Sequence, residues 1–193
     1  MDDKELVERL LSNDEAAFNY LWDGFYPRFL RFAMTLVHYD QDTAEDLVQE
    51  AFTHCLERLD QFEFKSKLST WLMRIIYYKA LHVRRNLGRH VPIIMTDDEG
   101  DETNLLDMLR SNGVRQDEAL SWKEAMLRYR EVLEELKDEE RTLWVLRQEE
   151  GLSYEQVVEV LGRNENTWRI TICRIKEKIS DKLAKCGTFI GLL

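Results

Sequence analysis

The chain has 193 residues, of which 44% are hydrophobic and 33% charged, a balance typical of folded globular proteins rather than disordered ones. No apolar run reaches the roughly 18 residues of a membrane span, and the acidic start MDDKELVERLL is unlike a signal peptide. The cysteines Cys55, Cys173 and Cys186 are too widely spaced for a disulfide framework or a zinc site. We therefore expect a cytoplasmic protein without a membrane segment, a metal ion or another cofactor.

Helical periodicity dominates the first 90 residues, where apolar side chains recur three and four positions apart. Helices are predicted over residues 4–11, 15–37, 44–60 and about 69–86. In the second of these, Pro27 predicts a kink or a helix start. In the third, Asp42 followed by Glu45 predicts an N-cap. Because no segment of more than a few residues alternates as a strand does, the expected fold class is all-α.

A change in composition divides the chain. Residues 88–118 contain Gly88, Pro92 and the acidic run TDDEGDE, which indicate a linker. The predicted organisation is a helical domain at 1–90, an acidic linker at 91–121, a second helical domain at 122–185 and a tail at 186–193.

The second domain contains a predicted helix-turn-helix. Ser153 and Gln156 have the spacing of a capping box, Gly162 follows as a helix stop, and Asn164 is placed to cap the next helix. The expected buried stripe of that helix is Trp168, Ile172, Ile175 and Ile179. A purely structural helical hairpin is the alternative.

Side chains suited to catalysis are scattered. Glu50 and His54 lie four residues apart, but no second histidine completes a zinc-binding pattern. No phosphate-binding glycine loop or nucleophile elbow occurs, and the acidic pair Asp97-Asp98 falls in the linker. The sequence therefore predicts a protein that is not an enzyme.

Two basic segments stand out in a chain whose net charge is −10. Residues 61–90 carry seven Lys or Arg and one Glu, and residues 163–185 carry seven Lys or Arg and three acids. In the first segment the cations interleave with Phe64, Trp71, Tyr77 and Tyr78. Cations neutralise phosphates and aromatic rings stack on unpaired bases, so this segment predicts a binder of single-stranded or melted DNA. The alternative is that Trp71, Ile75 and Tyr78, which lie on one helical stripe, form core.

The order of the motifs resembles bacterial RNA polymerase sigma factors, most closely the small two-domain extracytoplasmic-function (ECF) class. The resemblance covers about residues 5–183 and is carried by AEDLVQEAFTHCLERLDQF, STWLMRIIYYKALHVRRN and LEELKDEERTLWVLRQEEGLSYEQVVEVLG. It implies that domain 1–90 is region 2, which docks on the β′ clamp helices of core polymerase and opens the −10 promoter element. It implies that domain 122–185 is region 4, which contacts the β flap and the −35 element. An anti-sigma factor or another targeting protein is a further expected partner.

Site residues follow from the resemblance together with the predicted exposed faces. The expected core polymerase contacts are Asp46, Gln49, Glu50 and Thr53. The expected contacts to −10 DNA are Lys65, Lys67, Trp71, Arg74, Tyr77, Tyr78, Lys79, Arg84 and Arg85. The expected contacts to −35 DNA are Arg163, Asn166, Thr167, Arg169, Arg174 and Lys178.

The chain also departs from the family pattern. Tyr78 stands where family members often have Asn, and Phe64-Lys65 stands where a Gly-acid pair is common. The exposed face of the last helix carries Ile170 and Cys173, which are poor base readers. Two alternatives stay open: a polymerase-binding protein whose promoter targeting is supplied by another factor, and a dimeric helix-turn-helix regulator.

Overall fold

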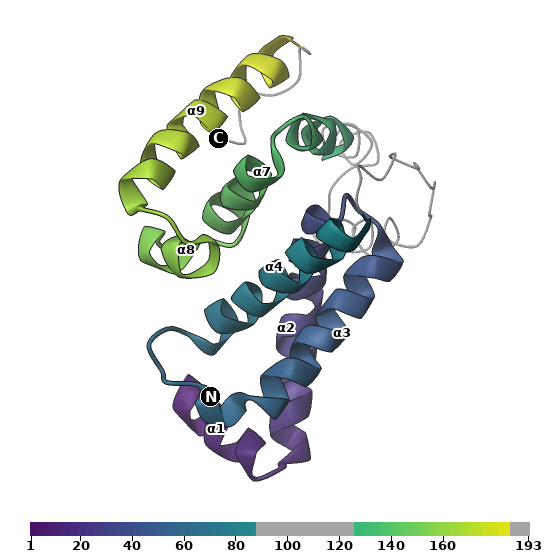
Figure 1. Ribbon diagram of the computed structural model, residues 1–193, viewed down its shortest axis with the longest axis vertical. Helices are drawn as coiled ribbons and strands as arrows, with labels where there is room; N and C mark the ends of the chain where they lie inside the picture. Colours follow the sequence, from purple (N-terminus) through teal and green to yellow (C-terminus); the bar gives the residue numbers. More distant parts are fainter. Residues whose placement is uncertain (88–125, 186–193) are drawn as a thin grey trace, which may run out of the picture. The chain divides into compact units, whose positions relative to one another are not determined.

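The computed structural model describes residues 1–87 and 126–185, and every regular element in these ranges is helical (Figure 1). The prediction of an all-α fold is therefore confirmed for the described residues. Residues 1–87 and 138–172 belong to one compact unit, and residues 126–137 and 173–185 to another. No described helix combines the length and hydropathy that a bilayer crossing needs.

The N-terminal half is a bundle of four helices and one short turn of 3₁₀ helix. In chain order these are α1 (Asp3–Leu11), α2 (Glu15–Leu36), α3 (Gln41–Glu57), η1 (Leu59–Gln61) and α4 (Leu68–Leu87). Helices α2, α3 and α4 pack pairwise, and α1 packs on α2. The core side chains Phe29, Phe32, Phe52, Leu72 and Ile76 are at most 2% exposed. Burial of these large apolar side chains is the main favourable term that holds the bundle together.

Helix starts in this bundle are fixed by aspartate caps. Asp2, Asp14 and Asp40 precede α1, α2 and α3, and their carboxylates accept N–H bonds from the first helical turns. The prediction of an N-cap at Asp42 was wrong, because Asp40 accepts from the Thr43 N–H at 3.1 Å and α3 begins two residues earlier. Asp42 lies instead in the first turn, where its charge favours the positive end of the helix dipole.

Pro27 lies inside α2, so of the two predicted alternatives, a kink or a helix start, the helix start is wrong. A proline removes one backbone hydrogen bond from a helix interior. Aromatic side chains pack along this part of the helix: Trp22 stacks on Tyr26 with ring centroids 4.7 Å apart, and Phe25 stacks on Phe29 at 5.7 Å. The helix continues through the proline.

The C-terminal half is also helical. Residues 126–134 are helical, and they are followed by α7 (Asp138–Trp144), a π-helical turn η2 (Val145–Glu149), α8 (Tyr154–Leu161) and α9 (Glu165–Lys185). The predicted capping box is confirmed, with the Ser153 hydroxyl accepting from the Gln156 N–H and the Ser153 N–H donating to the Gln156 side chain. The predicted stripe Trp168, Ile172, Ile175 and Ile179 is buried.

Two contacts from distant parts of the sequence fix the start of α4. The Leu68 N–H donates to the Asp3 carboxylate at 2.7 Å, so the first helix of the chain supplies a cap for α4. The Gln156 side chain of α8 donates to the Thr70 hydroxyl at 3.2 Å, and α8 packs along α4. The first turn of α4 is thereby held from two sides.

Candidate nucleic-acid interface

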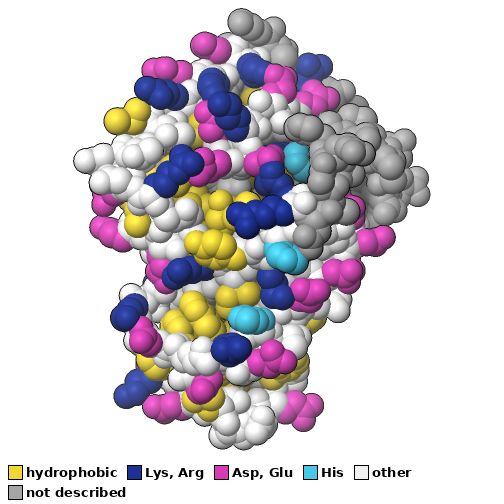
Figure 2. Space-filling view, viewed as in Figure 1, with side chains coloured by type: hydrophobic (Ala, Val, Ile, Leu, Met, Phe, Trp, Pro, Cys, Tyr) yellow, Lys and Arg dark blue, Asp and Glu magenta, His cyan; other side chains and the backbone are white. Residues whose placement is uncertain are grey.

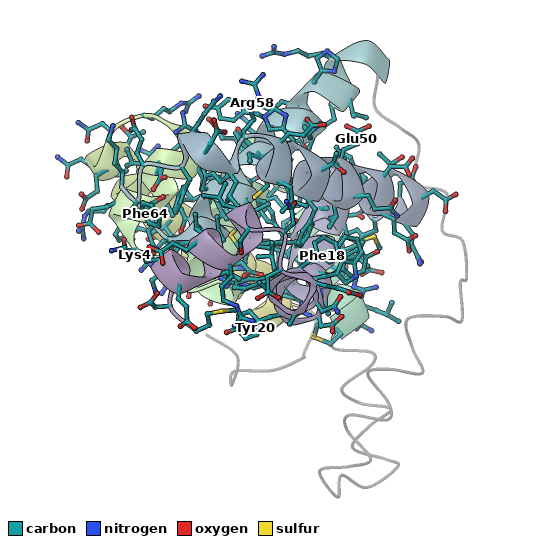
Figure 3. The ribbon with its side chains drawn as sticks, turned by 90° about the horizontal axis from the view of Figure 1, so that it is seen from below. Lys4, Phe18, Tyr20, Glu50, Arg58 and Phe64 are labelled. Carbon is teal, nitrogen blue, oxygen red and sulfur yellow. The ribbon has the colours of Figure 1, made fainter. Side chains whose placement is uncertain are left out.

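Helix α3 presents an acidic, polar strip on its outer side. The four residues expected to contact core polymerase, Asp46, Gln49, Glu50 and Thr53, are all exposed. The opposite side of α3 carries Leu47, Val48 and Phe52, which are buried in the bundle. Figure 3 shows Glu50 at the surface of this helix. The strip is therefore free of core packing, and its charge suits a basic partner surface.

A hollow of about 370 Å³ lies beside this strip, between α3 and α4. Four residues expected to bind −10 DNA meet there: Trp71, Arg74, Tyr78 and Lys79. The Arg74 guanidinium lies 5.7 Å from the centre of the Tyr78 ring, within cation–π range. Figure 2 shows hydrophobic side chains next to Lys, Arg and His on this face of α4. The hollow thus combines aromatic faces with positive charge.

Two histidines in the same hollow were missed by the sequence analysis. His54 of α3 and His82 of α4 both contribute to its lining. A signal for His82 was present, since residues 71, 75, 78 and 82 follow one helical stripe. His54 could not be placed this way, because it comes from a different helix.

The neighbouring tyrosines of α4 differ in exposure. Tyr78 is 49% exposed, whereas Tyr77 is only 8% exposed and meets Tyr78 edge-on with ring centroids 5.6 Å apart. Burial raises the pKa of the Tyr77 hydroxyl, and the charge of Glu139 adds to this effect. In this conformation Tyr78 presents a ring to solvent, and Tyr77 belongs to the packed interior.

The cations expected to bind −10 DNA also fall into two groups. Lys65, Lys67, Arg74 and Arg85 are exposed. Arg84 is partly buried and forms an ion pair with Asp138 of α7. Burial and the nearby charge of Arg141 lower the pKa of the Arg84 guanidinium. Arg84 is therefore already held by a protein carboxylate, as are Lys65 by Glu63 and Lys79 by Glu50.

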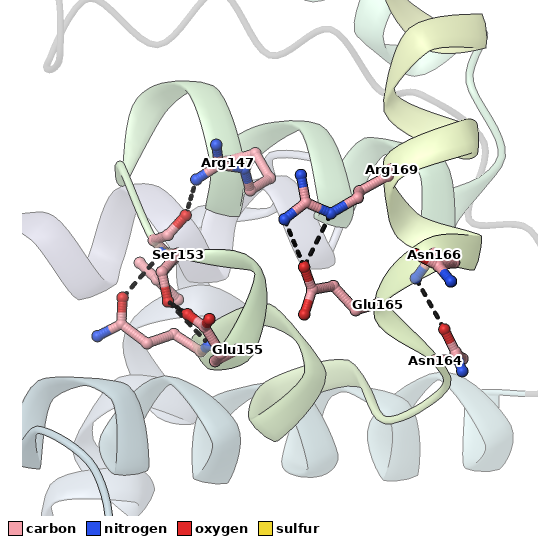
Figure 4. A network of polar contacts seen from close by, with 9 residues as sticks. Arg147, Ser153, Glu155, Asn164, Glu165, Asn166 and Arg169 are labelled. Atoms are coloured by element: carbon pink, nitrogen blue, oxygen red, sulfur yellow. Dashed lines mark hydrogen bonds and ion pairs between the residues drawn. The ribbon is translucent and has the colours of Figure 1, made fainter.

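The turn of the helix-turn-helix is held by side-chain hydrogen bonds (Figure 4). The Asn164 side chain accepts from the Asn166 N–H at 2.8 Å, in the manner of a cap. The Trp168 indole N–H donates to the Gly162 carbonyl at 2.7 Å, across a turn in which Gly162 has a φ of 74°. A positive φ at this point is the conformation that glycine adopts without strain.

All six residues expected to contact −35 DNA are exposed. Arg163 pairs with Glu139 at 2.9 Å, and Arg169 pairs with Glu165 while lying 4.4 Å from the Tyr154 ring centre. Ile170 is 55% exposed on the same helix, and Cys173 is exposed one turn further along. The surface of α9 is therefore a mixture of cations, polar groups and an exposed aliphatic side chain.

The described residues contain no cluster of three or more His, Cys, Asp or Glu side chains that could hold a metal ion. What the arrangement offers chemically is recognition of anions and of planar rings.

Comparison with protein families places two known regions on this chain. Residues 21–90 match sigma-70 region 2, and residues 126–179 match sigma-70 region 4. The first match contains the strip on α3 and the hollow beside α4. The second contains the helix-turn-helix.

Curated relatives match over nearly the whole chain. RNA polymerase sigma-H factor of Pseudomonas aeruginosa is 30% identical over 181 residues, which cover 94% of this chain and 93% of that protein. The ECF RNA polymerase sigma-E factor of Escherichia coli strain K12 is 30% identical over 184 residues, 95% of each chain.

Solved structures share the fold. CnrH, solved in complex with the cytosolic domain of CnrY, has a TM-score of 0.65 at 21% identity and covers 95% of this chain and 97% of its own. The sigma factor RpoE of Bartonella quintana, solved with the anti-sigma factor NepR, has a TM-score of 0.62 at 20% identity, over 86% of this chain and 96% of its own.

Proposed function

The chain is an ECF-type RNA polymerase sigma factor with sigma-70 regions 2 and 4, a non-catalytic factor that directs the polymerase to promoters, and from this premise we propose how its surfaces divide that work. Residues 1–90 act as region 2, residues 91–121 as an acidic linker and residues 122–185 as region 4, followed by a tail at 186–193. The protein works in the cytoplasm, where core polymerase and promoter DNA meet.

Region 2 docks on the β′ clamp helices through the outer strip of α3. The supporting observation is that Asp46, Gln49, Glu50 and Thr53 are exposed together, opposite the buried face of the same helix. Because these acidic side chains do not pack in the core, they can contact a basic partner surface at little cost to folding. Region 4 contacts the β flap.

Region 2 holds the opened −10 element on α4. The observation that carries this proposal is the hollow in which Trp71, Arg74, Tyr78 and Lys79 meet, because it joins aromatic faces to cations. A base stacked on an aromatic ring contributes about 1–3 kcal/mol in single-strand binders, without the need to read its edges. The hollow therefore favours unpaired bases over a closed duplex.

Region 4 clamps the −35 duplex mainly through its phosphate backbone. Arg163, Arg169, Arg174 and Lys178 are all exposed, and Arg163 and Arg169 pair with Glu139 and Glu165. A bidentate base contact discriminates by about 1–3 kcal/mol, and this face offers few such candidates. We expect binding that positions the polymerase but selects sequence weakly.

A protein partner for the same helix is the second candidate. Ile170 is 55% exposed and Cys173 is exposed beside the cations of α9. Apolar groups of this kind gain by being covered on a protein surface. Relatives of this fold were solved with NepR, an anti-sigma factor, and with the cytosolic domain of CnrY, so an anti-sigma factor is the proposed occupant.

The test of the proposed function is transcription from a promoter library with core polymerase and this protein alone. We expect transcripts that share a −10 sequence and a weaker −35 preference. Promoter-independent transcription, with core binding intact, would favour the alternative in which another factor supplies targeting. Size exclusion alone and with core polymerase tests the dimeric-regulator alternative, for which we expect a monomer that joins the polymerase one to one.

A further inference from the structure

Two histidines line the hollow between α3 and α4. His54 comes from the last turn of α3 and His82 from α4, and both residues are exposed. Figure 2 shows histidine beside Lys, Arg and hydrophobic side chains on this face of the molecule. Histidine is the side chain whose charge ordinarily changes between pH 5 and 8. The positive charge that lines the hollow therefore depends on pH within this range.

The permanent cations of the hollow are Arg74 and Lys79. Lys79 forms an ion pair with Glu50, in which the ammonium and a carboxylate oxygen lie 2.8 Å apart. The Arg74 guanidinium lies 5.7 Å from the centre of the Tyr78 ring. Since Glu50 offsets the charge of Lys79, Arg74 supplies the remaining permanent positive charge among the residues that line the hollow. A proton on either histidine would add substantially to it.

Permanent charges of both signs also flank the two histidines. They stand three or four residues from a histidine, or line the hollow with it: Glu50, Glu57 and Arg58 on α3, and Arg74, Lys79 and Arg85 on α4. Side chains of these types keep their charge between pH 6 and 8, and a tyrosine such as Tyr78 stays neutral there. Among the residues that line the hollow, acidification in this range therefore adds positive charge through His54 and His82.

We infer that His54 and His82 make the grip of region 2 on the opened promoter strand proton-dependent, because each imidazolium holds a phosphate of the strand. The inference rests on the proposed role of region 2 in holding melted DNA and adds the regulation of that site by pH. A nearby phosphate favours the charged form of histidine, so the DNA-bound state binds more protons than the free state. By linkage, affinity for the opened strand rises as the pH falls.

The test measures the affinity of the full chain, assembled with saturating core polymerase, for forked promoter DNA at pH 6, 7 and 8. The wild type should bind more tightly at pH 6 than at pH 8. His54→Gln and His82→Gln should each reduce that gain by about fivefold, the upper range for one exposed ion pair. His54→Lys should instead bind tightly at both ends of the range, because its cation is permanent.

Salt gives a second readout that a merely structural role would not move. Each phosphate contact on a single strand adds about 0.7 to the slope of log K against log salt. The wild-type slope should therefore be steeper at pH 6 than at pH 8, by up to about that amount for each histidine. The Gln variants should lose their share of the difference. Core polymerase contributes a pH dependence of its own, so the comparison is always between wild type and variant.

Controls separate this inference from the proposed function. His38 follows α2 and lies beside Asp138, so His38→Gln should keep the wild-type gain at low pH. An unchanged gain in both hollow variants, together with weaker forked-DNA binding by Trp71→Ala, would overturn the inference and leave the proposed function standing. The same pH dependence on closed duplex would also overturn it. Forked-DNA binding unaffected by Trp71→Ala at every pH would reject the proposed function itself.

Discussion

The ammonium of Lys79 lies 2.8 Å from a carboxylate oxygen of Glu50 and so joins the proposed DNA surface on α4 to the proposed polymerase surface on α3. Glu50 is the more exposed partner, with 65% of its side-chain surface accessible, against 28% for Lys79. An exposed pair of this kind contributes about 0.2–1 kcal/mol to stability. A substitution at Glu50 therefore alters two binding surfaces at once, while Asp46 reports on docking alone.

Charge reversal on α3 should weaken polymerase binding. We expect Asp46→Lys alone to weaken core binding and the Asp46→Lys/Glu50→Lys double variant to weaken it at least about 10-fold, because like charges would then face the clamp helices. Both residues are exposed, so the thermal midpoint should change little. The matched control is Glu8→Lys/Asp23→Lys, which makes the same change in net charge on α1 and α2. Equal affinity of the two double variants for core polymerase would remove α3 as the docking face.

Single-strand binding should depend on salt through the exposed arginines. Each phosphate contact on a single strand contributes about 0.7 to the slope of log K against log salt. Arg74→Gln and Arg85→Gln should each reduce that slope by about this amount in the polymerase complex with forked DNA. Arg31, an exposed arginine of α2, serves as the control and should leave the slope unchanged. A slope unaffected by all three substitutions would place the DNA elsewhere.

The strain at Phe64 predicts an unusual order of stability. Alanine normally stabilises a site relative to glycine by about 0.4–1 kcal/mol, through the unfolded chain. At a φ of 56° this order should reverse, because the left-handed conformation costs a residue with a Cβ atom about 1–2 kcal/mol. Phe64→Gly should therefore be more stable than Phe64→Ala by about 1 kcal/mol in denaturant unfolding of the full chain. Ala16 is at an exposed position in the first turn of α2. There the usual order should hold, so the Ala16→Gly variant should be less stable than the wild type in denaturant unfolding.

The cysteines should differ sharply in reactivity. Burial raises the pKa of the Cys55 thiol to about 12, so almost none of it is thiolate at pH 8. Cys173 is exposed on α9. Iodoacetamide at pH 8 should label Cys173 and spare Cys55 until the protein is unfolded, as read by peptide mass spectrometry. Because the thiol with a raised pKa gains reactivity only as pH approaches that value, labelling of folded Cys55 at pH 8 would contradict its buried environment.

One substitution on α9 separates DNA from protein as the partner of its exposed face. Ile170→Arg places a cation between Arg169 and Arg174, so it should raise affinity for duplex of any sequence severalfold if the face lies on DNA. The measurement is duplex binding by the polymerase complex, with a −35 sequence and a scrambled one. Unchanged duplex affinity, together with loss of an anti-sigma complex, would assign the face to protein instead. Tight, sequence-selective binding by the wild type would contradict the weak −35 preference.

The local pattern of the sequence was sufficient to predict the helices and the turn of the helix-turn-helix. The spacing of Ser153 and Gln156 predicted the cap of α8, and the stripe from Trp168 to Ile179 predicted the buried side of α9. These features depend on residues within about one to three helical turns, so the amino-acid order alone contains them. The exposure of Asp46 and Glu50 on α3 followed from the same periodicity.

Only the tertiary structure decided which of several equivalent side chains became exposed and which distant groups met. Periodicity marks a helix face but not the neighbour that covers it. The alternative of a core stripe through Trp71, Ile75 and Tyr78 was wrong for Tyr78, which is 49% exposed, whereas Tyr77 is 8% exposed. The Asp3 cap on Leu68 joins residues 65 positions apart, beyond the reach of any local pattern. Phe64 has a left-handed backbone with a φ of 56° and its ring lies against Phe62, a contact that periodicity did not predict.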